Sequence, residues 1–124
     1  MKTIPIAQVK RKDRAVEDEA WIRAMLHRAA IGILATANNG QPYITSRHFV
    51  FDETTNVIYM HAAPAGRTRT DVEANPAVCF SVSEMGRQLP APTAFGMGSE
   101  FASVVVFGRA AIVTDEAEAT RALQ

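Results

Sequence analysis

The hydrophobic positions of this 124-residue chain follow a helical pattern near its beginning and a strand pattern over most of the rest. Ile22, Met25, Leu26 and Ala29 recur at the spacing of one helical face, which predicts a helix over residues 17–29. Runs rich in β-branched and aromatic residues predict strands over 31–37, 41–51, 57–61, 77–83 and 101–113. The first three strands follow one another without helical crossovers, so the sheet should be antiparallel. Together these elements predict a mainly β fold that closes into a small barrel, which would leave no exposed edge.

Turn and helix signals lie between the predicted strands. Asn38-Asn39-Gly40 is a strong hairpin signal. A short helix over Gly66–Ala74 must end near Asn75-Pro76. Residues 85–98 contain three glycines and two prolines, which predicts an irregular loop, either a functional lid or a disordered surface insertion. A final helix should begin at Asp115, with Glu118 completing a capping box.

Length, charge and cysteine content exclude several classes of protein. Residues 1–124 are expected to form one domain, with residues 1–16 as a charged N-terminal arm. Thirteen basic and thirteen acidic residues cancel, which argues against nucleic acid or an anionic membrane as a partner. The single cysteine excludes an internal disulfide and a cysteine-rich metal site, and no metal ligand set is found. No apolar segment suits a membrane span or a signal peptide, so a soluble cytoplasmic protein is expected.

The segment around the second predicted helix has the residues of an anion site. Gly66, Arg67, Thr68 and Arg69 stand where the helix begins, and the first helical N–H groups have no intrahelical partner. Two guanidinium groups and a hydroxyl beside those donors favour a phosphate ligand. The alternative is that both arginines are solvated charges on a surface helix. His61, at the end of the preceding strand, is either a partner in this site or a structural histidine.

The strand over 41–51 is polar in its middle. Thr45, Ser46, Arg47 and His48 follow one another, which is typical of an edge strand or of a face that lines a wet cleft.

The order of these elements resembles the FMN-binding split-barrel family of pyridoxamine 5′-phosphate oxidase-like flavoproteins, and within it the nitroimidazole-resistance (Nim) branch most. Four stretches carry the likeness, over nearly the whole chain: residues 11–14 with the following helix, 32–43, 58–76 and 103–115. The resemblance implies a homodimer of antiparallel split β-barrels with FMN in the cleft between subunits. Family chains continue past the last helix, so it also implies that part of the usual C-terminal region is missing or built differently.

The resemblance also implies roles for particular residues. Arg67 matches a basic residue on the FMN phosphate, whereas Thr68 stands where a second lysine or arginine is usual, a charge that Arg69 could supply. His61 matches a histidine near the flavin. Ile44, Thr45 and Ser46 match the strand whose backbone lines the isoalloxazine ring, and Ser46 and His48 replace an expected proline and asparagine. The candidate cofactor-binding residues are therefore Ile44, Thr45, Ser46, Tyr59, His61, Gly66, Arg67, Thr68 and Arg69.

These residues favour a protein that takes its chemistry from a cofactor. No Ser-His-Asp, paired-carboxylate or metal-ligand set appears at useful spacing, whereas a flavin carries hydride and electron transfer by itself. We therefore expect an FMN-dependent oxidoreductase of a small soluble substrate, with His61 as the candidate catalytic residue for proton transfer. The alternatives are a split-barrel protein that uses deazaflavin F420 or haem, a non-catalytic FMN-binding protein, and a scaffold without ligand.

Overall fold

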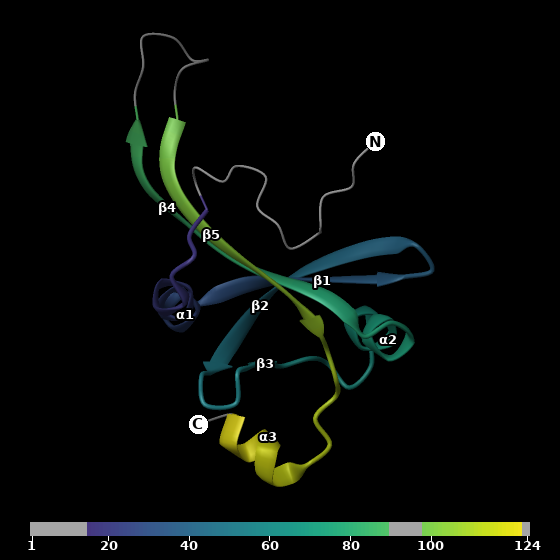
Figure 1. The fold of residues 1–124 in the computed structure, drawn as a ribbon. Coiled ribbons are helices and arrows are strands. Elements are labelled where there is room, and N and C mark those ends of the chain that lie inside the picture. Colours follow the sequence, from purple (N-terminus) through teal and green to yellow (C-terminus); the bar gives the residue numbers. More distant parts are fainter. Residues whose placement is uncertain (1–14, 90–97, 123–124) are drawn as a thin grey trace.

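Five strands form one antiparallel sheet in a computed structural model that describes residues 15–89 and 98–122 (Figure 1). The strands are β1 (Ile31–Asn38), β2 (Gln41–Asp52), β3 (Val57–Met60), β4 (Ala77–Leu89) and β5 (Gly98–Arg109). The helices are α1 (Glu19–Arg28), α2 (Arg67–Ala74) and α3 (Glu116–Ala122). The strand order across the sheet is β3-β2-β1-β4-β5. Most of the expected N-terminal arm and the centre of the expected 85–98 loop lie outside the described residues.

The β1–β2 hairpin confirms the strongest turn signal in the sequence. Asn39 and Gly40 both have positive φ, 52° and 76°, as the tightest hairpin turns require. From this turn the two strands pair along the whole of β1, from Asn38 opposite Gln41 to Ile31 opposite His48. The register places Tyr43, Thr45 and Arg47 on one face of β2, because side chains alternate along a strand.

The hydrophobic core lies on one face of this sheet. Along β1, Leu34 and Thr36 are buried, whereas Ile31 and Ile33 on the other face are exposed. Helix α1 covers the core face and contributes Met25, which is completely buried. The buried core residues are Met25, Leu26, Leu34, Phe51, Phe80, Val82 and Val104. The opposite face of the sheet therefore remains apolar and uncovered by the described residues.

A glycine on β1 makes room for the ring of Phe80 in the core. Phe80 of β4 is 4% exposed and lies edge-on to Phe49, with 4.8 Å between ring centroids. A Cβ atom at Gly32 would lie 2.1 Å from Cζ of Phe80, far inside van der Waals contact. Phe80 is held between Gly32 and Phe49, so it cannot move aside freely. Gly32 is therefore required for core packing.

We predict that Gly32→Ala lowers the free energy of unfolding by about 1–3 kcal/mol, the usual cost of overpacking a core. Gly108→Ala on β5 is the matched control, because a Cβ there meets nothing within 4 Å. Urea unfolding of both variants and the wild type checks the difference. Equal stability of the two variants would contradict the packing argument.

Two expectations about the strands are wrong. Residues 85–89 belong to β4, and β5 begins at Gly98, where a loop was expected. The β4–β5 pairing passes Gly86 through a register shift between Met85 and Gln88, so pairing overrides the local loop signal. At the other end, β5 stops at Arg109 instead of continuing to Val113.

The sheet does not close into a barrel. β3 has only four residues and pairs with β2, while β5 pairs with β4, so these two strands are the ends of the sheet. Helix α3 lies near the β3 end (Figure 1), where Glu118 accepts a 2.7 Å hydrogen bond from the Tyr59 hydroxyl. Asp115 Oδ1 accepts from the Ala117 N–H at 3.0 Å and caps α3 as expected. Glu118 thus bonds to Tyr59 instead of completing a capping box.

Candidate functional site

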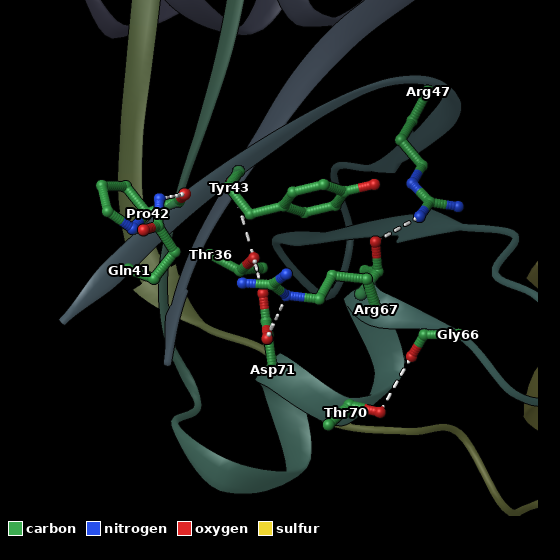
Figure 2. Close-up of polar contacts among 10 residues, drawn as sticks. Thr36, Gln41, Pro42, Tyr43, Arg47, Gly66, Arg67, Thr70 and Asp71 are labelled. Carbon is green, nitrogen blue, oxygen red and sulfur yellow. Dashed lines mark hydrogen bonds and ion pairs between the residues drawn. The ribbon is translucent and has the colours of Figure 1, made fainter. Parts of the chain in front are cut away.

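A cavity of about 170 Å³ lies where the start of α2 meets β2 and the β3–α2 loop. Three of its residues are arginines, Arg47 from β2 and Arg67 and Arg69 from α2. Figure 2 shows Arg47 and Arg67. The lining residues are Tyr43, Thr45, Arg47, Ala62, Ala63, Gly66, Arg67, Thr68 and Arg69. Five predicted cofactor-binding residues are therefore together here: Thr45, Gly66, Arg67, Thr68 and Arg69.

Gly66 gives the cavity backbone donors. It is the N-cap of α2 and has φ 149° and ψ 179°, a conformation that is strained for any residue with a Cβ. No side chain caps the helix there, so no capping hydrogen bond occupies the first N–H groups of α2. Such N–H groups at a helix start favour an anion.

Arg67 is held in place from two sides. Its Nε donates to Asp71 Oδ1 at 3.1 Å, one helical turn further along α2. Its guanidinium lies 5.2 Å from the centroid of the Tyr43 ring on β2, a cation–π contact. Neither of these contacts uses the hydrogens on its two terminal nitrogens, so Arg67 keeps donors for a ligand.

Asp71 is the buried link between α2 and the sheet. It has no exposed surface, and its Oδ2 accepts a 2.8 Å hydrogen bond from the Thr36 hydroxyl of β1 (Figure 2). Burial raises the pKa of Asp71. Hydrogen bonds from Thr36 and Arg67, together with the charge of Arg67, lower it by more, so the pKa lies below its ordinary value of 3.8. Asp71 is therefore a carboxylate that positions Arg67.

We predict that Asp71→Asn lowers the melting temperature by about 5 °C or more at neutral pH. Because the folded-state pKa is depressed, the carboxylate stabilises the protein fully above its unfolded pKa. This contribution is lost as the pH falls through the folded pKa. The variant should therefore lose less stability than the wild type between about pH 5 and pH 3. Thermal unfolding across this range measures both effects.

The control is Glu73→Gln. It removes an exposed carboxylate of the same helix, the one that pairs with Arg69. It should change the melting temperature little, because exposed ion pairs contribute little. Parallel stability curves for Asp71→Asn and the wild type would contradict the role given to Asp71.

Arg47 connects β2 to the loop that follows β3 and to the first turn of α2. Its Nη1 donates to the His61 carbonyl at 2.8 Å, and its Nη2 donates to the Thr68 hydroxyl at 2.6 Å. Its Nε donates to Thr45 Oγ1 at 3.1 Å. Of the polar row 45–48, Thr45 and Arg47 therefore line the cavity, whereas Ser46 and His48 belong to the opposite face of the sheet. β2 is an interior strand, not an edge strand.

Arg69 lines the cavity but already has a partner. Its Nε donates to Glu73 Oε1 at 2.7 Å, an ion pair along the helix surface. Its charge is therefore partly balanced before any ligand arrives.

The remaining predicted residues do not line this cavity. Ile44 and Ser46 alternate with Thr45 and belong to the opposite face of the sheet. Tyr59 bonds to Glu118, and that hydrogen bond, followed by burial, raises the Tyr59 pKa. His61 precedes the lining residues Ala62 and Ala63, and its side chain is exposed.

Sequence reasoning did not single out Tyr43, Arg47, Asp71 or Thr36 as site residues. Alternation along β2 from Thr45 predicts Tyr43 and Arg47, since all three share a face. Asp71 follows Arg67 by four residues, the spacing of an ion pair on a helix. Thr36 gives no such signal, because its contact with Asp71 spans 35 residues.

None of the helices in the described part of the chain has the length and apolarity to cross a membrane. Within the same residues, no group of three or more His, Cys, Asp or Glu side chains is placed to hold a metal ion.

Comparison with known proteins assigns the family. The family model described as pyridoxamine 5′-phosphate oxidase matches residues 18–124. The chain belongs to this family. No curated protein sequence gives a significant match. The match spans every helix and strand of the fold, which agrees with the resemblance seen in the sequence.

Solved structures share the split-barrel fold of this pyridoxamine 5′-phosphate oxidase family. The flavocytochrome Anf3 from Azotobacter vinelandii has a TM-score of 0.74 and 27% identity over 86% of this chain and 48% of its own. A protein described as a 5-nitroimidazole antibiotic resistance protein from Bacteroides thetaiotaomicron has a TM-score of 0.73 and 20% identity, covering 87% and 63%. An FAD-binding protein from Mycobacterium smegmatis has a TM-score of 0.66 and 20% identity, covering 86% and 77%. The chain thus spans about half of the flavocytochrome.

Proposed function

We propose that this protein binds FMN through the phosphate group and uses it as an oxidoreductase of a small soluble substrate. One observation carries the proposal: three arginines and an uncapped helix start line the same cavity. Family membership supports it, as do the names of the flavocytochrome and the FAD-binding protein.

The cavity suits the phosphate end of the cofactor. Sites that enclose a whole drug-sized ligand have about 300–1,000 Å³, whereas this cavity has about 170 Å³. A phosphate group and the atoms next to it fit that volume, and a tricyclic ring does not. Guanidinium groups and helix N–H groups are the donors that phosphate oxygens prefer. The residues present therefore fit the anionic end of FMN.

The protein's own residues would bind and orient the cofactor, which supplies hydride and electron transfer when bound. In this proposal Arg67 and the N–H groups after Gly66 hold the phosphate, and Asp71 keeps Arg67 in position. His61 would hold or donate a proton at its imidazole, since it directly precedes the cavity lining. Its carbonyl is already fixed by Arg47, which places the residue without using the ring.

The visible absorption spectrum of the purified protein tests this proposal, followed by mass spectrometry of what it releases on denaturation. The proposal expects a flavin spectrum and the mass of FMN. A haem spectrum, the mass of F420, or failure to bind added FMN would contradict it.

We also propose that a second copy of the chain covers the apolar face of the sheet. Large hydrophobic side chains on this face are 41% to 64% exposed, whereas soluble monomers rarely leave extended apolar patches. The residues concerned are Ile31, Ile33, Ile44, Val50, Val105 and Phe107. Isologous pairing buries the same patch on both copies at once.

Analytical ultracentrifugation at micromolar concentration should therefore show a dimer. Val105→Glu should convert it largely to monomer, because a charge would be buried in the interface. Val113→Glu is the control, since Val113 is exposed but lies outside the sheet. A wild-type monomer that retains flavin would contradict the proposal.

A further inference from the structure

The three arginines of the cavity differ in how their charge is balanced. Arg67 pairs with the carboxylate of Asp71, and Arg69 pairs with that of Glu73. Arg47 instead donates only to neutral oxygens: the hydroxyls of Thr45 and Thr68 and the carbonyl of His61. Among the described residues that line the cavity, Arg47 therefore carries the positive charge that no carboxylate offsets.

Arg47 also keeps donors for a ligand. A guanidinium has five N–H groups, and the hydrogen bonds to described residues use one on each nitrogen. One N–H on each terminal nitrogen remains. Because those nitrogens are fixed by the His61 carbonyl and the Thr68 hydroxyl, the two donors are held in place before a ligand arrives.

We propose that Arg47, from β2, is a phosphate-binding residue of this cavity and supplies the charge that threonine at position 68 cannot. This inference rests on the proposed function, in which the cavity holds the FMN phosphate. Thr68 takes part through Arg47: its oxygen accepts from Nη2 at 2.6 Å, so its own hydroxyl hydrogen is left for a phosphate oxygen.

A simpler role for Arg47 would be to hold the loop between β3 and α2. A residue that only holds the loop would also weaken FMN binding, because the loop lines the same cavity, but a charge placed at position 68 would not restore that affinity. A residue that binds the phosphate weakens FMN and spares riboflavin, which lacks the phosphate, and a charge placed nearby can replace it. The two ligands therefore tie the effect to the phosphate, and the relocated charge separates the two roles.

The experiment titrates FMN and riboflavin into Arg47→Ala and into wild-type protein, both freed of ligand, and follows binding by flavin fluorescence. We expect FMN to bind at least about tenfold more weakly to the variant, and riboflavin to change by less than about threefold. The dependence of FMN affinity on salt should also become shallower, because one charge contact is lost. Arg23→Ala is the control, since Arg23 is on α1 and does not line this cavity.

A relocated charge gives a second, independent test. Thr68 lies within 2.6 Å of the Arg47 guanidinium, so Thr68→Lys brings an ammonium group to the same region. In the Arg47→Ala background it should recover most of the lost FMN affinity without changing that for riboflavin. With Arg47 present it should add little, because the two cations repel each other. The double-mutant cycle measures this coupling.

If Arg47→Ala does not fold, Arg47→Gln keeps a hydrogen-bonding side chain there, removes the charge, and should show the same selective loss of FMN. Equal weakening of FMN and riboflavin, or no recovery with Thr68→Lys, would overturn the role of Arg47. If Arg67→Ala abolishes the preference for FMN but Arg47→Ala leaves it intact, only this inference fails. If the wild type does not prefer FMN to riboflavin, the proposed function fails with it.

Discussion

Arg67→Ala is expected to weaken FMN binding by about 10- to 100-fold and to leave riboflavin binding nearly unchanged. A hydrogen bond to a charged group contributes roughly 1.5–3 kcal/mol, and each 1.4 kcal/mol is a factor of ten in affinity. Asp71 and Tyr43 hold Arg67 before the ligand binds, so little ordering entropy opposes its contacts. Titration calorimetry with both flavins measures the two affinities.

One further variant separates the charge of Arg67 from its shape, and the melting temperature separates an effect on binding from an effect on the fold. Arg67→Lys keeps the charge but loses the planar fork, so it should bind FMN with intermediate affinity. Arg67→Ala also leaves the buried Asp71 carboxylate without its ion pair, which could destabilise the fold. The melting temperature of the variant must therefore be measured together with its flavin affinities. Equal loss of FMN and riboflavin at an unchanged melting temperature would remove Arg67 from the phosphate site.

His61→Asn is expected to lower reductive turnover by about 10²- to 10⁴-fold while FMN affinity changes little. Positioned acid–base groups contribute this range, and asparagine can hydrogen-bond but does not titrate near neutral pH. The substitution leaves the backbone carbonyl that accepts from Arg47, so the loop contact beside the cavity is retained. Steady-state turnover with a nicotinamide donor and FMN titration of the same preparation measure the two quantities.

The matched control for His61→Asn is His48→Asn, an exposed histidine on the opposite face of β2. It should leave turnover within about threefold of the wild type if only a histidine at position 61 supplies acid–base catalysis. Full turnover in His61→Asn would make His61 structural and leave the chemistry to the flavin alone. Absence of turnover in the wild type, with FMN bound, would favour a non-catalytic flavin-binding protein.

Local signals predicted much of the fold. Asn39-Gly40 predicted the hairpin, because few residues other than glycine and asparagine adopt its backbone conformation. The pattern also placed α2 correctly, since Gly66 and Asn75-Pro76 mark its two ends. The extension of β4 past Gly86 could not be predicted locally, because it depends on pairing with β5. Barrel closure was not predicted correctly, because β3 and β5 do not pair with each other and remain the two ends of the sheet.

The candidate site could be predicted only where its residues are neighbours in sequence. Gly66, Arg67, Thr68 and Arg69 form one segment, and the structure brings all four to one cavity. Arg47 and Thr68 are 21 residues apart, and Thr36 and Asp71 are 35 apart. These contacts depend on how α2 packs against β1 and β2, which no local pattern encodes. The distribution of charge among the arginines followed only from those contacts.

Parallel titrations of FMN and riboflavin into wild-type protein freed of ligand test whether the cavity binds the phosphate group of the cofactor. The two ligands share the ring and the ribityl chain and differ in the phosphate group that the cavity is proposed to bind. We expect FMN to bind at least about tenfold more tightly than riboflavin, and we expect this difference to shrink as salt is added. Equal affinity for the two flavins at low salt would contradict it.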